Sequence, residues 1–243
     1  MVQGTALQER GLADTAAQPP VAAVPSKATT VPKVDKTLQR RLLKREVQKG
    51  QWGYATQHCI MAWKRIHADV PATQILEADP DIAKPLYFWQ LVSLIGTELM
   101  FDIVNKFYTR VYEDIEDPTF VAAFTRVAKK EHHIETQIQL WVDAMGAGKF
   151  YHGGASRLDF HHKNNASQVL NHCGAVRWMG HMRDTFEETN FGEDPRVKVA
   201  MMDFLFVMME HYKHDFKFNT GAAVYGDEWI GQQMCDAKGA NRV

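Results

Sequence analysis

The sequence predicts an all-α protein, and three observations carry that prediction. Apolar residues recur at intervals of three and four in most segments, which is the period of a helix packed against a core. No segment alternates polar and apolar residues as a half-buried strand does. Prolines and glycines divide the chain into pieces that suit helices of ordinary length. The 243 residues are enough for one sizeable core with an appendage.

The first 35 residues predict an extended, low-complexity tail. This segment is rich in Ala, Pro, Thr, Val and Gln, and it lacks the apolar periodicity that a core requires. A helical extension is predicted over residues 36–85. Its first part, Lys36 to Lys49, holds six basic residues and one acidic residue, with leucines at helical spacing. Both a solvated surface helix and a docking helix fit this pattern.

An apolar stripe follows within residues 51–67. Trp52, Cys59, Ile60, Trp63 and Ile66 fall on one side of a predicted helix of about four turns. Large apolar side chains in water are unfavourable, so the stripe must pack on the rest of the chain or on a partner.

The remaining residues predict a main domain over 86–218 and a C-terminal tail over 219–243. Residues 86–112 read as two helices separated near Gly96, and Asp117-Pro118 begins a new turn. A helix over 126–145 ends at Gly146, and residues 149–167 read as a loop. Two more helices are predicted at the end of the domain, over 168–189 and from Pro195 to Phe218.

Composition excludes several classes of function. The 28 basic and 29 acidic residues nearly cancel, so no global field attracts nucleic acid or a membrane surface. No apolar run is long enough for a transmembrane helix. The three cysteines form no Cys-x-x-Cys pair, which favours a reducing intracellular compartment over a disulfide scaffold. A di-iron carboxylate bundle, a phosphate-binding loop and a nucleophile elbow all lack their motifs.

Two of the predicted helices carry polar residues among apolar ones. Tyr108 lies in one predicted helix, and His133 and Gln137 lie four residues apart on another. Residues at i and i+4 share one helix face, so both side chains can meet the same ligand. A core tyrosine and a solvated surface around His132 and His133 fit the same positions. The acidic cluster around Asp114 is typical of a solvated turn.

Four segments with local signatures follow one another in a fixed order. They are Phe107–Tyr112 (FYTRVY), Lys130–Ile134 with the run to Gly146, Arg157–His162 (RLDFHH) and Arg177–Met182 (RWMGHM). Taken in that order, they resemble a truncated globin of the second group, the subfamily with plant and bacterial members. Trp178 with the pair His181-Met182 is the mark of that group, although a buried structural tryptophan fits the position as well.

The resemblance implies a two-on-two helical sandwich that holds heme b. It selects His162 as the iron ligand, because Arg157-Leu158 and three further residues lead up to this histidine; His161 is the alternative. Past this point the family continues with a Pro-Phe-Pro-type stretch, where this chain has residues 163–167 as KNNAS. The other cofactor-binding and gas-binding residues that the resemblance implies are Phe124, Tyr108, His133, Gln137 and Trp178.

The resemblance further implies binding of a diatomic gas, with reversible oxygen binding or nitric oxide oxidation as the activity. The alternative is a globin-fold accessory subunit of a large assembly, with or without heme. In both cases we expect residues 1–67 to contact protein partners, because the tail is too polar and proline-rich to fold alone.

Overall fold

The computed structural model describes residues 50, 52–70, 76–152, 154–166 and 169–218. The predicted tail over 1–35, the basic segment over 36–49 and the C-terminal tail from 219 lie outside the described residues. The domain boundaries proposed from the sequence therefore stay predictions.

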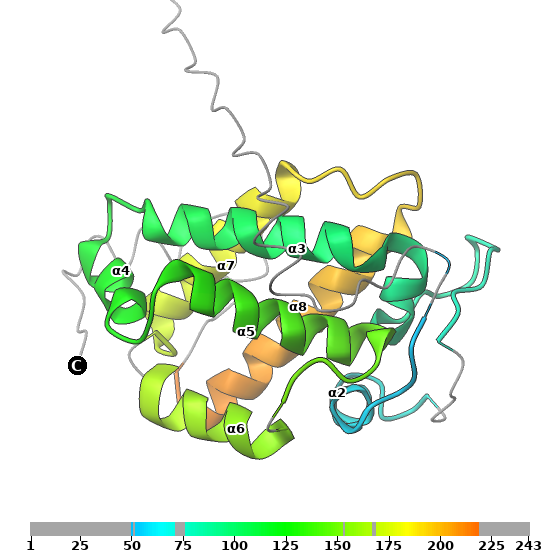
Figure 1. Ribbon diagram of the computed structural model, residues 1–243, viewed down its shortest axis with the longest axis horizontal. Helices are drawn as coiled ribbons and strands as arrows, with labels where there is room; N and C mark the ends of the chain where they lie inside the picture. Colours follow the sequence, from blue (N-terminus) through cyan, green and yellow to red (C-terminus); the bar gives the residue numbers. More distant parts are fainter. Residues whose placement is uncertain (1–49, 51, 71–75, 153, 167–168, 219–243) are drawn as a thin grey trace, which may run out of the picture. The chain divides into compact units, whose positions relative to one another are not determined.

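The described part of the chain is helical and contains no strand, which confirms the all-α class (Figure 1). Short turns of 3₁₀ or π type adjoin some of the helices, at Phe88–Gln90, Asp143–Ala147 and His162–Ala166. The α-helices are α2 (Gln57–Ile66), α3 (Leu91–Tyr112), α4 (Pro118–Thr125), α5 (Lys130–Val142), α6 (Gly154–His161), α7 (His172–Glu187) and α8 (Arg196–Phe216).

Helix α3 is the centre of the domain, and most of its side chains are buried. The sequence predicted two helices separated near Gly96, and α3 indeed consists of two helical segments joined by a kink at Gly96, where the backbone is not helical. The backbone φ of Gly96 is 67°, a value that glycine adopts without the steric cost borne by other residues. The predicted separation of the two helical segments near Gly96 is therefore confirmed.

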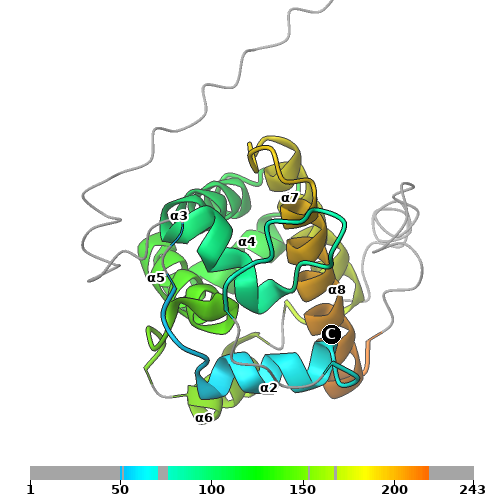
Figure 2. The same ribbon diagram turned by 90° about the vertical axis from the view of Figure 1, so that its right-hand side faces the viewer.

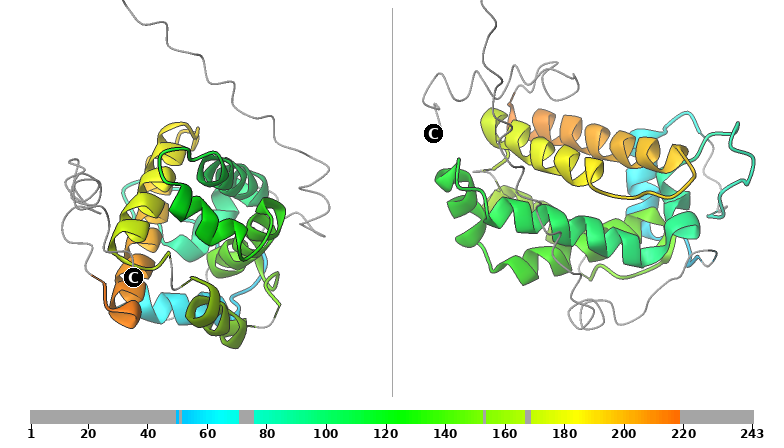
Figure 3. Two further views of the ribbon diagram at one scale, coloured as in Figure 1. Left: turned by 90° about the vertical axis from the view of Figure 1, so that its left-hand side faces the viewer. Right: turned by 90° about the horizontal axis from the view of Figure 1, so that it is seen from above.

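Two pairs of helices enclose the core, as a two-on-two sandwich requires. Figure 3 shows α7 and α8 side by side on one side of the domain, with α3 and α5 on the other. Helix α3 packs against α5 within its own pair and against α7 in the other. Fully buried apolar side chains, including Phe101, Val104, Ile138 and Met182, fill the space within the domain.

Local sequence signals explain where several helices begin. Asp117 caps α4 by accepting a hydrogen bond from the backbone N–H of Phe120 at 2.9 Å, and Pro118 occupies the first turn. Asn171 caps α7 in the same way, through the N–H of Gly174 at 3.0 Å. These caps fix the starts of α4 and α7, two helices that line a cavity inside the domain.

The prediction of a loop over residues 149–167 was wrong. The structure has helix α6 there, followed directly by the π turn His162–Ala166. Helix α5 likewise ends at Val142 and continues as the π turn Asp143–Ala147. Gly146 in this turn has a φ of 99°, and a Cβ at this position would lie 2.3 Å from the carbonyl oxygen of Trp89. Short helices flanked by glycines give too little periodicity to be recognised in a sequence.

The apolar stripe of residues 51–67 packs on the domain itself. Trp63 in α2 is only 2% exposed and stacks on Trp89, with ring centroids 3.9 Å apart. The backbone N–H of Gly53 donates to Gly146 O at 3.0 Å, and Thr56 donates a short hydrogen bond to the buried carboxylate of Asp143. Cys59 and Trp63 are therefore covered by the domain without a partner protein, whereas Trp52 is 43% exposed. Figure 2 shows α2 lying along the domain.

Two further expectations from the sequence concern membrane-spanning helices and the state of the cysteines. No helix in the described part of the chain combines the length and apolar character needed to span a bilayer. Cys59 is buried and free, whereas Cys173 in the first turn of α7 is disulfide-bonded. The reading of the cysteines as reduced therefore fails for Cys173, since widely spaced cysteines carry no local signal of pairing.

Candidate functional site

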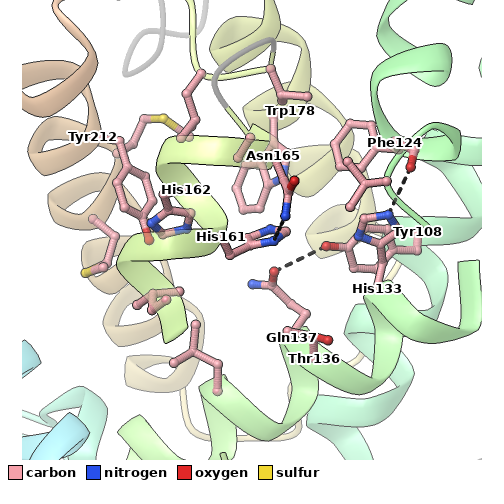
Figure 4. A pocket seen from close by; sticks show the side chains of 18 of the residues that line it. Tyr108, Phe124, His133, Thr136, Gln137, His161, His162, Asn165, Trp178 and Tyr212 are labelled. Carbon is pink, nitrogen blue, oxygen red and sulfur yellow. Dashed lines mark hydrogen bonds between the residues drawn. The ribbon is translucent and has the colours of Figure 1, made fainter. Parts of the chain in front are cut away.

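A cavity of about 150 Å³ lies among α3, α4, α5, α6, α7 and α8 (Figure 4). Its lining is largely apolar, with polar side chains at a few positions. All the residues singled out from the sequence line this cavity, although they come from separate segments: Tyr108, Phe124, His133, Gln137, His161, His162 and Trp178. The structure thus brings together the whole predicted set.

Tyr108 and Gln137 form a hydrogen-bonded pair on one wall of the cavity. The hydroxyl of Tyr108, on α3, donates to Gln137 Oε1 on α5 at 3.3 Å. Burial, with a smaller contribution from Tyr112, raises the pKa of Tyr108 well above its usual value. The phenol therefore keeps its proton at neutral pH and can act as a hydrogen-bond donor.

His133 shares this wall, as its spacing from Gln137 predicted. Its Nε2 lies 3.1 Å from the carbonyl oxygen of Phe124, and its ring stacks on Tyr108 with centroids 5.4 Å apart. Burial lowers the pKa of His133, so the imidazole is neutral at pH 7. A carbonyl can only accept, so Nε2 carries the proton and Nδ1 keeps its lone pair. The side chain is thereby tied to the end of α4.

Phe124 and Trp178 add aromatic surface to the cavity. The ring of Phe124, on α4, meets Tyr108 and His133 edge-on, at centroid distances of 6.1 and 5.6 Å. Trp178, on α7, packs against Phe107 with centroids 4.8 Å apart. Its indole N–H is a donor only, which suits an oxygen atom as its partner.

The two adjacent histidines of the opposite wall face different ways. The ring of His161 points across the cavity toward Gln137 and Tyr108 (Figure 4). The ring of His162 packs edge-on against Tyr212 of α8, with centroids 4.5 Å apart, and this change of direction occurs where α6 passes into the π turn. Turns of π type occur often at functional sites.

The environment of His161 suits a metal ligand. Its pKa is lowered by burial, and further by His132 and Arg157, so the ring is neutral at pH 7. Asn165 Nδ2 lies 3.4 Å from Nδ1 of His161. Turning the amide by half a rotation would bring its oxygen to the same place, where Nδ1–H would donate and leave Nε2 for a metal.

A buried charge network lies next in the chain to Trp178, which lines the cavity, and sequence reasoning missed this network. Asp114 was expected in a solvated turn, but its side chain is only 2% exposed. Arg177 donates to both of its carboxylate oxygens, and His181 Nε2 lies 2.8 Å from Oδ2. The backbone N–H groups of Glu116 and Asp117 also donate to Oδ1, at 3.0 and 3.2 Å. Arg177 holds the pKa of Asp114 well below its usual range despite burial.

This network fixes two parts of the cavity at once. It joins the turn between α3 and α4 to α7, one residue before Trp178, and it supports the start of α4. Helix α4 in turn carries the carbonyl that holds His133. No sequence signal could reveal the pair, because Asp114 and Arg177 are 63 residues apart.

Comparisons with known proteins match the part of the chain that builds the cavity. The family model of bacterial-like globins matches residues 91–211, which include both walls of the cavity. The chain belongs to the bacterial-like globin family. It is 27% identical to Two-on-two hemoglobin-3 of Arabidopsis thaliana over 127 residues, or 51% of this chain and 65% of that protein. The match thus spans less than two thirds of that relative. A comparison with solved structures gave no significant match.

Membership of this globin family supports heme binding in general, and the cavity fits that group. One wall offers imidazole nitrogens for iron, the other offers hydrogen-bond donors, and the rest of the lining is largely apolar. Thr136 also lines the cavity, and its buried Oγ1 has no hydrogen-bond partner among the described residues. Unpaired buried hydroxyls are costly and uncommon, which is consistent with a site that receives a ligand.

Proposed function

We propose that this globin holds one heme b in the cavity and binds a diatomic gas, oxygen in the first instance. The observation that carries the proposal is the juxtaposition of His161 and His162 on one wall with Tyr108 and Gln137 on the other. The heme is of b type in this proposal, because the sequence has no Cys-x-x-Cys-His motif for covalent attachment.

The iron ligand in this proposal is one of the two adjacent histidines. The sequence pattern favours His162, whereas the ring orientation favours His161. Heme would need one nitrogen with a free lone pair, and a neutral imidazole supplies it. A π turn that begins between the two residues allows a small rotation to exchange their directions.

The opposite wall would stabilise the gas by hydrogen bonding. Heme, when bound, supplies the iron that carries the gas. Tyr108 stays protonated, and its hydroxyl donates to Gln137 Oε1, which leaves the Gln137 amide N–H free as a donor. When a gas is bound, the Tyr108 hydroxyl would turn from Gln137 and donate to the gas instead. Trp178 contributes an indole N–H, and Phe124 supplies a flat apolar face for the porphyrin. The Phe124 carbonyl holds the Nε2–H of His133, so this ring would line the pocket without donating that proton to the gas.

Nitric oxide oxidation is the second reaction that this arrangement suits, because the same donors would hold oxygen while nitric oxide reaches it. The alternative role as an accessory subunit rests on segments outside the described residues. The expectation that residues 1–67 contact protein partners is weakened, because Trp63 and Cys59 are buried within the domain itself.

An absorption spectrum of the purified full-length chain tests the proposal. We expect a Soret band, a shift of that band on addition of carbon monoxide to the reduced protein, and one heme per chain. A protein that stays colourless after expression with added heme precursor, and after titration with hemin, would contradict it.

A further inference from the structure

A continuous row of aromatic rings leads away from the cavity. Phe204, on α8, lines the cavity, and its ring centroid lies 5.2 Å from that of Phe88. Phe88 meets Trp89 at 5.1 Å. Trp141 also lines the cavity and lies 6.4 Å from Phe204. Aromatic contacts of this kind are ordinary in cores, so the row alone indicates no function.

The far end of the row is a stack of oxidisable side chains. Trp89 is stacked with Trp63 at 3.9 Å and with Tyr87 at 4.5 Å, and the ring planes differ by 10° and 2° respectively. Tryptophan and tyrosine are the side chains that lose an electron most readily among aromatic residues. Close parallel stacking spreads a positive charge over neighbouring rings, which makes oxidation of the stack easier than that of a single ring.

The stack ends at a surface crevice. Trp63 and His67 line this crevice, which has a volume of about 400 Å³, together with the exposed Lys64. Tyr87 is half-buried, and His67 meets both Tyr87 and Trp89 edge-on. A small molecule in the crevice would therefore reach a ring that is in direct contact with the stack.

We propose that these rings carry electrons from the crevice to the cavity while a hydroperoxide is reduced there. This inference rests on the proposed heme. Hydrogen peroxide takes up two electrons and two protons to give two waters. The electrons leave the stack one at a time, and a phenol in the crevice replaces each of them. Two phenols thus become two phenoxyl radicals, and their hydroxyl protons supply the two protons.

The hydrogen bonds of the two indoles favour movement of the positive charge outward. Trp89 Nε1 is buried without a hydrogen-bond partner among the described residues, so an oxidised Trp89 finds no stabilising acceptor there. Trp63 Nε1 donates to the carbonyl oxygen of Val70 at 3.2 Å. A carbonyl dipole aimed at the indole N–H stabilises a radical cation. The charge is therefore more stable on Trp63, beside the crevice, than on Trp89.

The stack is built from residues that precede the part of the chain matched by the globin family model. Trp63, Tyr87 and Trp89 all lie before residue 91, and Trp63 comes from α2. The N-terminal extension thus adds the final ring of the route. This placement gives α2 a functional role in addition to its packing role.

Electron paramagnetic resonance of the heme-loaded full-length chain, frozen just after hydrogen peroxide is added, tests the proposal. We expect an organic radical whose spectrum narrows when the protein contains ring-deuterated tryptophan. Trp63→Phe should lose most of that signal, while Trp52→Phe, an exposed tryptophan outside the stack, should retain it. Addition of a phenol should shorten the lifetime of the radical in the wild type.

The outcomes separate this inference from the proposed function. Absence of a Soret band would contradict the heme assignment itself. A normal Soret band without a tryptophan radical, or with a radical that is unchanged in Trp63→Phe, would overturn the electron route alone. The deuterium experiment uses the unaltered protein, so it tests for a tryptophan radical even if Trp63→Phe fails to fold. A radical signal that disappears in Trp178→Phe, at a tryptophan that lines the cavity outside the stack, would place the radical beside the heme and overturn the route.

Discussion

The two walls of the cavity differ in how firmly the chain fixes them. Tyr108, His133 and Gln137 project from α3 and α5, two long helices that pack against each other. His161 and His162 come from a helix of eight residues and the π turn after it, where Phe160 is exposed and Asn164 bonds to the Phe160 carbonyl nearby. One wall is held by the core of the domain, whereas the other makes mainly local contacts and packs on α8 through the ring of His162.

The difference separates two tasks of a heme pocket. Hydrogen-bond donors must be placed accurately, because their strength falls steeply with distance and angle. An iron ligand can reach its metal after a small local rotation, because the bond it forms provides the driving force. We infer that the donor wall is built in advance and that the histidine wall adapts when heme binds.

The largest expected effect concerns the anchor of the donor wall. Asp114→Ala leaves the buried Arg177 with only the exposed Glu116 as an acidic partner and frees the turn before α4, so it should lower the free energy of unfolding by about 3–5 kcal/mol. Chemical denaturation measures this change. Asp184→Ala is the matched control, because Asp184 forms an exposed ion pair with Arg183 on the same helix and should cost no more than about 1 kcal/mol. Equal effects would mean that the buried network is not an anchor.

The histidine wall is tested by replacing its two imidazoles one at a time. We expect one of His161→Ala and His162→Ala to abolish the Soret band and the other to keep most of it, since only one nitrogen binds the iron. His214→Ala, at a side chain that is 91% exposed, should leave the spectrum unchanged. Equal loss in the two variants, or no loss in either, would contradict a single ligand from this pair.

A smaller effect is expected from the donors themselves. Tyr108→Phe removes a hydroxyl that faces the cavity and leaves the ring in place. A hydrogen bond contributes about 0.5–1.5 kcal/mol, so oxygen should dissociate roughly two to ten times faster. Stopped-flow measurement of oxygen release tests this, with Tyr54→Phe, an exposed tyrosine, as the control. An unchanged rate in Tyr108→Phe would show that the hydroxyl does not face the ligand.

The smallest effect is a dependence of stability on pH. The folded protein lowers the pKa of His133 and His161 below the usual value of 6.5. As pH falls through 6.5, the unfolded chain takes up protons that the folded chain does not, so stability decreases with falling pH. Denaturation at pH 7.5 and 5.5 should show this loss, and His133→Phe should reduce it. A stability that is constant over this range would contradict the burial of neutral imidazoles.

The sequence predicted the helices of the donor wall better than the helix of the histidine wall. The spacing of His133 and Gln137 and the Asp117-Pro118 cap are local signals, and local signals survive in a single sequence. The glycine-flanked helix α6 has too few residues for periodicity to show, which explains why it was read as a loop.

Other features depend on residues that meet only in the folded chain. Asp114 pairs with Arg177 across 63 positions, and Trp63 of α2 stacks on Trp89 of a separate helical segment. The apolar stripe indicated that Trp63 must be buried, but it could not indicate which ring would cover it. The direction of His161 relative to His162 depends on a π turn, for which the sequence offered no signal.

A crystal structure of the heme-loaded chain tests the central claim most directly. We predict heme in the cavity between the two walls, with iron bound to Nε2 of His161 or His162 and with Tyr108 and Gln137 close to their present positions. The backbone of residues 154–166 should account for most of the difference from the structure described above. Heme bound elsewhere, or a donor wall that rearranges as much as the histidine wall, would contradict the account.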